Sequence, residues 1–156
     1  MKAATIHEIK EELNTLKVSQ LTDLCLRLSR FKKENKELLT YLLFEAHNEP
    51  DYVASIKKEI DDLFGEINLS HLYFAKKSLR KIVRIINKYC RYSSSKQTEV
   101  ELRIYFCTVL KESGIPIEKN AVINNLYQSQ VKKTRTVLAT LHEDLQYDYS
   151  RQLEEL

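Results

Sequence analysis

The chain has 156 residues, of which 43% are hydrophobic and 30% charged, and its formal net charge is +3. It contains only two glycines and two prolines, which disfavours a turn-rich β-protein and rules out the clustered glycines of a phosphate- or dinucleotide-binding loop. A chain of this length supports a hydrophobic core without metal or disulfide. We therefore expect residues 1–156 to form a single domain without a cofactor.

The N-terminal half shows apolar residues at three- and four-residue spacing, which predicts α-helices. Thr5 fits the N-cap of a first short helix. Three further helices are expected at residues 20–31, 36–48 and 52–64. The helix at 36–48 is apolar nearly all round, which is typical of the middle of a bundle or stack. Pro50 suits the first turn of the next helix, and Gly65 its end.

The same spacing continues in the C-terminal half. A fifth helix is expected to start near Ser70, and a sixth is expected to end at Gly114. A seventh begins near Asn120, either as one long helix or as two that break near Gln130. The fifth helix is expected to run through 72–92, and a loop at 93–97 separates it from the sixth helix at 99–113. A frayed acidic tail is expected at 147–156.

These elements predict an all-α fold of six or seven antiparallel helices. An α-solenoid-like stack, of the armadillo or HEAT kind, and a closed helical bundle both fit the short links between them. No internal repeat decides between the two arrangements.

The fifth helix carries an unusual charge pattern. The stretch "FAKKSLRKIVRIINKYCRY", residues 74–92, has seven basic residues and no acid. On a helical wheel the apolar residues share one arc and the cations the opposite one. The apolar arc consists of Leu72, Ala75, Leu79, Ile82, Val83, Ile86 and Cys90. Tyr73, Phe74 and Tyr92 are expected on or beside the basic side.

This basic arc is the candidate binding site. Regularly spaced cations neutralise phosphates, and exposed aromatic rings stack on unpaired bases. We expect an anionic partner, either single-stranded RNA or another nucleic acid, or an acidic protein surface. The residues predicted to contact it are Tyr73, Lys77, Arg80, Lys81, Arg84, Lys88 and Arg91.

Other interpretations of the basic arc stay open. One is a solvated face, with or without pairing to acids from residues 57–66 or 142–149. It then only aids solubility, and the protein is an interaction module or homodimer that uses exposed apolar helix faces. An enzyme without a recognisable motif is the third hypothesis, although no catalytic residues, metal ligands or cofactor-binding residues are indicated and we expect no enzyme. A membrane-surface helix would need the apolar arc free of the core.

The chain is expected to be cytoplasmic and not to insert into a membrane. The N-terminal segment carries acids where a signal peptide needs an apolar core. The apolar stretch at 38–44 is far shorter than the roughly 18 residues of a membrane span. The odd number of cysteines, three, argues against a disulfide framework and fits buried thiols.

Three segments, "FKKENKELLTYLLFEAHNE", "LYFAKKSLRKIVRIINKYCRY" and "LHEDLQYDY", resemble those of small uncharacterised bacterial helical proteins. The resemblance covers most of the chain. It implies a bacterial, cytoplasmic, all-helical protein and implies nothing about chemistry.

Overall fold

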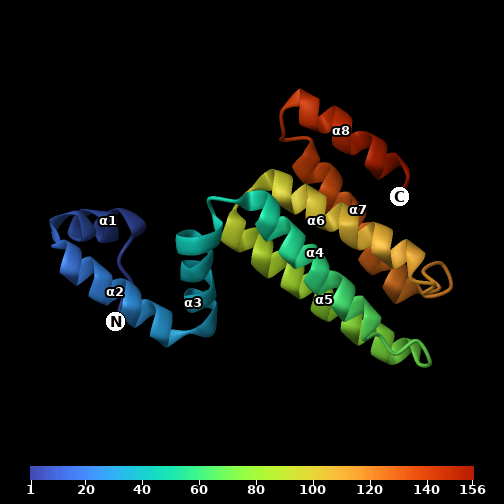
Figure 1. The fold of residues 1–156 in the computed structure, drawn as a ribbon, viewed down its shortest axis with the longest axis horizontal. Helices are drawn as coiled ribbons and strands as arrows, with labels where there is room; N and C mark the ends of the chain where they lie inside the picture. Colours follow the sequence, from blue (N-terminus) through green and yellow to red (C-terminus); the bar gives the residue numbers. More distant parts are fainter. The chain divides into compact units, whose positions relative to one another are not determined.

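The computed structural model describes all 156 residues, as eight α-helices and one π-helical segment without a β-strand (Figure 1). The predicted all-α class is therefore confirmed. The chain divides into two compact units, residues 1–44 and 45–156. The single-domain prediction and the choice between stack and bundle concern both units together and stay predictions. None of the helices is long and apolar enough to cross a membrane.

The first unit contains α1 (Ile6–Thr15), α2 (Val18–Phe31), α3 (Lys33–Thr40) and nearly all of the π-helical segment η1 (Tyr41–Glu45). Thr5 caps α1 as predicted, because its Oγ1 accepts the Glu8 N–H while the Glu8 carboxylate accepts the Thr5 N–H at 2.7 Å. The helices α1, α2 and α3 bury no side chain. Leu42, Leu43 and Phe44 are also exposed, in contrast to the central position predicted for residues 36–48.

The second unit contains α4 (Glu49–Gly65), α5 (Leu72–Ser93), α6 (Lys96–Glu112), α7 (Ala121–Leu138) and α8 (Glu143–Glu154). Successive helices from α4 to α7 reverse direction (Figure 1). Pro50 lies in the first turn of α4 and Gly65 at its end, as predicted. Gly114 follows α6 with φ of +75°, a left-handed conformation that favours glycine.

The chain breaks between α7 and α8 rather than near Gln130, and this break gives the eighth helix. Gln130 lies inside α7 and is buried. His142 caps α8 by accepting the Asp144 N–H, and Gln146 Nε2 donates to the Leu141 carbonyl at 2.8 Å. These side-chain bonds satisfy backbone groups at the break without glycine or proline.

Residues 147–156 differ from the predicted frayed tail. They continue α8 as far as Glu154, and the helix buries Tyr149 and Leu153 against α6 and α7. The apolar side of α8 therefore holds it to the second unit, although the segment is rich in charge.

The core of the second unit is centred on α6, which contacts α4, α5, α7 and α8. Its fully buried apolar side chains are Val100, Leu102, Phe106, Cys107 and Leu110. Burial raises the pKa of Cys107 and of Cys90 on α5 to about 12, so both thiols stay protonated at neutral pH.

One charged side chain, Arg103 of α6, lies inside this core with only 4% of its surface exposed. Its guanidinium donates to Glu99 Oε1 at 2.6 and 2.9 Å, within α6. It also donates to Gln130 Oε1 of α7 at 2.6 Å and to Asn87 Oδ1 of α5 at 2.9 Å. A buried charge needs such partners, and these bonds tie three helices together.

We expect Arg103→Met to destabilise the second unit by about 3 kcal/mol, because it leaves Glu99, Asn87 and Gln130 without their common donor. Urea unfolding followed by circular dichroism measures this. The control is Lys57→Met, which breaks the half-exposed Lys57–Glu101 pair and is expected to cost less than about 1 kcal/mol. Equal effects of the two substitutions would contradict the role given to Arg103.

Candidate anion-binding face

The orientation of α5 is set by its apolar stripe. Ala75, Leu79, Ile82, Ile86 and Cys90 are buried, and the helix packs against α4, α6 and α7. This stripe matches the predicted arc, except that Leu72 is exposed and Val83 half-buried. Because the stripe belongs to the core, it is not free to enter a bilayer surface, and the opposite side of α5 faces solvent.

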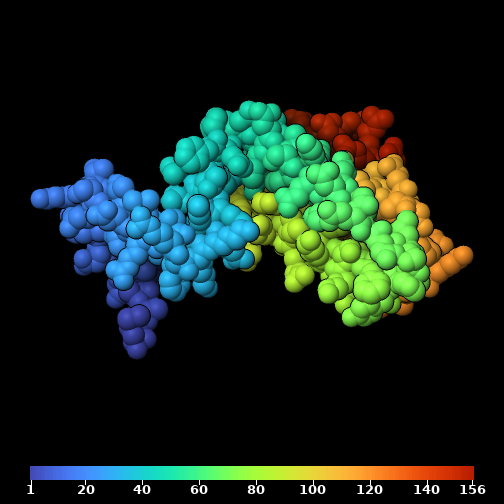
Figure 2. Space-filling model, turned by 60° about the horizontal axis from the view of Figure 1, so that its bottom comes forward, coloured from blue at the N-terminus to red at the C-terminus, as the bar shows by residue number.

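The structure exposes six of the seven predicted site residues. Figure 2 shows the surface of the molecule, with α5 in yellow-green. The exposed members are Tyr73, Lys77, Arg80, Lys81, Arg84 and Arg91. Lys88 is half-buried, and its Nζ lies 4.6 Å from the ring centre of Tyr89 and 5.9 Å from that of Tyr92.

The five exposed cations of α5 form no ion pair. Two of the acids suggested as partners accept hydrogen bonds from tyrosines instead. On α4, Glu59 accepts a hydrogen bond from Tyr89 and Asp61 accepts one from Tyr105, each at 2.7 Å. The other acidic segment forms α8, which packs on α6 and α7. The positive charge of α5 is therefore available to an external anion.

Four of the basic residues line a groove between α5 and α7 with a volume of about 620 Å³. Its lining residues are Tyr73, Lys76, Lys77, Arg80, Val83, Arg84 and Leu126. The groove thus has cationic sides, an apolar surface supplied by both helices and no carboxylate. Its volume falls within the range of about 300–1,000 Å³ that is usual for small-molecule sites.

Aromatic rings gather at the N-terminal end of α5. Tyr73 is 72% exposed, and its ring centre lies 5.5 Å from that of Phe74, which is also exposed. His71 adds a third ring, 6.1 Å from Phe74. Rings in this position offer π-faces beside the cationic groove.

The prediction that Tyr92 lies on or beside the exposed basic side is wrong, because only 8% of its surface is exposed. It lies in the last turn of α5, where the start of α4 covers the helix. Ser93 donates to the Glu49 carboxylate, and Tyr52 of α4 donates to the Tyr89 carbonyl at 3.2 Å. The wheel assigned Tyr92 by its angle alone and took no account of a neighbour at the helix end.

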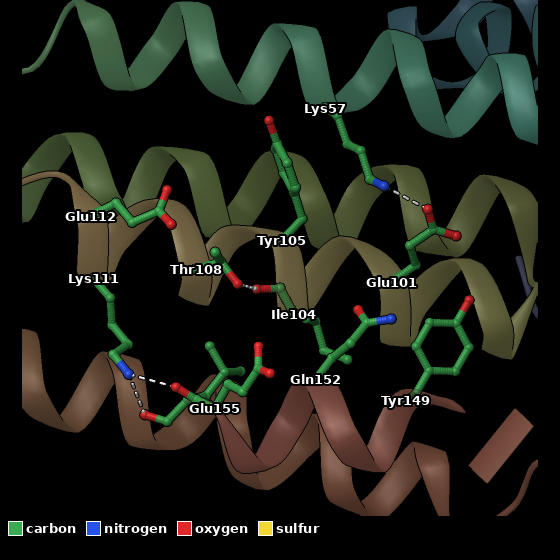
Figure 3. Close-up of a pocket in the computed structure, with 11 residues that line it drawn as sticks. Lys57, Glu101, Ile104, Tyr105, Thr108, Lys111, Glu112, Tyr149, Gln152 and Glu155 are labelled. Carbon is green, nitrogen blue, oxygen red and sulfur yellow. Dashed lines mark hydrogen bonds and ion pairs between the residues drawn. The ribbon is translucent and has the colours of Figure 1, made fainter. Parts of the chain in front are cut away.

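A second cleft, lined by α4, α6 and α8, has a volume of about 580 Å³ (Figure 3). It contains the Lys57–Glu101 ion pair at 2.6 Å, and Lys111 donates to the Glu155 carbonyl at 2.7 Å. Burial and the bond to Asp61 raise the pKa of Tyr105 to about 12, which keeps this phenol protonated. With Glu112 and the Glu155 side chain also lining it, the cleft holds three carboxylate side chains.

The aliphatic hydroxyl of this cleft, that of Thr108, is not bonded to a base. The Thr108 hydroxyl donates to the Ile104 carbonyl at 3.1 Å instead (Figure 3). The paired charges hold α4, α6 and α8 together, so we assign the cleft a structural role.

Comparison with protein-family models, with curated proteins and with solved structures finds no match to this chain. We therefore infer function from the geometry of α5 and its neighbours.

Sequence reasoning missed two residues that shape this face. Leu126 of α7 reaches the groove, and a helical wheel of α5 alone does not include it. Arg103 has one sequence signal, the Glu99–Arg103 spacing of four residues on a helix. That spacing predicts the ion pair, but the burial of the pair depends on α5 and α7.

Proposed function

We propose that the protein is a non-catalytic binding module that holds a phosphate-bearing polyanion, foremost a nucleic acid, on the basic face of α5. The observation that carries the proposal is the set of exposed cations without an acid partner: Lys77, Arg80, Lys81, Arg84 and Arg91.

The spacing of these cations supports a linear ligand. Lys77 and Arg91 are separated by about 21 Å along the helix, at 1.5 Å per residue. A charged strand that follows α5 meets a cation roughly every turn, and each phosphate neutralised releases condensed counterions. No carboxylate lies on α5 to repel the strand.

The exposed rings of Tyr73 and Phe74 favour a nucleic acid over an acidic protein surface. A carboxylate-rich protein needs only the cations, whereas bases also gain from stacking on aromatic side chains. Tight binding of an acidic polypeptide in place of nucleic acid would favour the protein alternative.

We expect replacement of Arg80, Arg84 and Arg91 by Glu to abolish binding of a labelled single-stranded oligonucleotide. Fluorescence anisotropy at two salt concentrations measures it, and each phosphate contact contributes about −0.7 to the slope of log K against log salt. The helical circular dichroism is expected to stay unchanged, because all three side chains are exposed.

The matched control replaces Lys58, Lys119 and Arg151 by Glu. These exposed residues lie on α4, in the loop before α7 and on α8. The change in net charge is identical, so a loss of affinity confined to the α5 variant locates the site. Equal losses in both variants would contradict it and leave only a non-specific charge effect.

A second candidate function, self-association, is supported by the first unit. Its helices α1, α2 and α3 bury no side chain, and Phe31 is 75% exposed. A unit of about 40 residues rarely folds without help from an oligomer, a metal or disulfides. A second copy of the chain is the occupant that we propose for the apolar side of α2.

For this second candidate we expect Leu28→Glu to lower the mass in solution from dimer to monomer, since it places a charge in the apolar contact. Sedimentation velocity measures it. Leu69→Glu is the control, because Leu28 and Leu69 are both 59% exposed and Leu69 lies outside the first unit. A monomeric wild-type chain would rule out the homodimer.

A further inference from the structure

The groove between α5 and α7 differs from a simple phosphate site, because part of its lining is apolar. Lys76, Lys77, Arg80 and Arg84 contribute the charge, while Val83 of α5 and Leu126 of α7 contribute aliphatic surface. Phosphate is strongly hydrated and gains nothing from aliphatic side chains. The occupant that matches both halves of the lining carries a flat apolar group next to an anion.

Comparison with the cleft in Figure 3 shows what distinguishes the groove from a cavity of similar size. The two volumes are close, about 580 and 620 Å³. The cleft holds three carboxylate side chains beside its two lysines, whereas the groove holds four cations and no carboxylate, so of the two the groove favours an anion.

We infer that this groove is a subsite for one unpaired nucleobase, with the flanking phosphates on the cations of α5. The inference rests on the proposed nucleic-acid function and adds a preference for single strands. Val83 and Leu126 contact the base, and the exposed ring of Tyr73 stacks beside it. A base in a duplex is already paired and stacked, so it cannot offer its face to the groove.

The test compares the wild-type chain on two labelled oligonucleotides of equal length: oligouridylate, and its abasic counterpart with the same phosphates. Stacking of one base predicts roughly tenfold tighter binding of oligouridylate. The double variant Tyr73→Ala, Leu126→Gln is expected to lose most of this ratio and to keep the wild-type affinity for the abasic strand, because its cations are intact. Tyr147→Ala, which removes a 69% exposed tyrosine of α8, is expected to keep the tenfold ratio.

The outcomes separate the inference from the proposed function. Equal wild-type affinity for the two oligonucleotides overturns the base subsite and leaves the polyanion-binding face intact. No binding of either strand at low salt overturns both. Because Tyr73 is largely exposed, the single variant Tyr73→Ala provides a folded reference if the double variant is unstable.

Discussion

The buried guanidinium of Arg103 is the constraint on which the second unit depends. A charge in a core must keep its hydrogen bonds, and these bonds are directional. Arg103 reaches Asn87 of α5 and Gln130 of α7 from its position on α6. The three bonded helices therefore have one rotational setting in which the charge is satisfied. In that setting the apolar stripe of α5 also meets the core, so polar and apolar packing agree.

The rotational setting of α5 determines the surface that it presents. Because Leu79, Ile82 and Ile86 are buried, the cations on the opposite side of the helix face solvent. No neighbouring acid neutralises the five exposed ones, and α7 supplies Leu126 at their edge. The proposed ligand site is thus a consequence of core packing: charge comes from one helix and an aliphatic contact from the next.

Local patterns in the sequence predicted the helices and the stripe of α5, because helical periodicity and the Thr5 cap are properties of neighbouring residues. Features that depend on contacts between helices could not be predicted from these local patterns. The burial of Tyr92 depends on the start of α4, and that of Arg103 on α5 and α7. The break before α8 lacks glycine or proline and relies on side-chain bonds of His142 and Gln146. The basic arc of α5 was predicted, but the groove beside it was not, because Leu126 of α7 forms part of its lining.

Lysine acetylation of the native chain, mapped by mass spectrometry with and without a single-stranded oligonucleotide, measures directly which face binds the strand. Lys77 and Lys81 on α5 and Lys58 and Lys119 elsewhere are all exposed, so each reacts in the free protein. We expect the oligonucleotide to protect Lys77 and Lys81 and to leave the acetylation of Lys58 and Lys119 unchanged. Uniform protection of all four, or protection of Lys58 and Lys119 alone, would contradict the assignment of the binding face to α5.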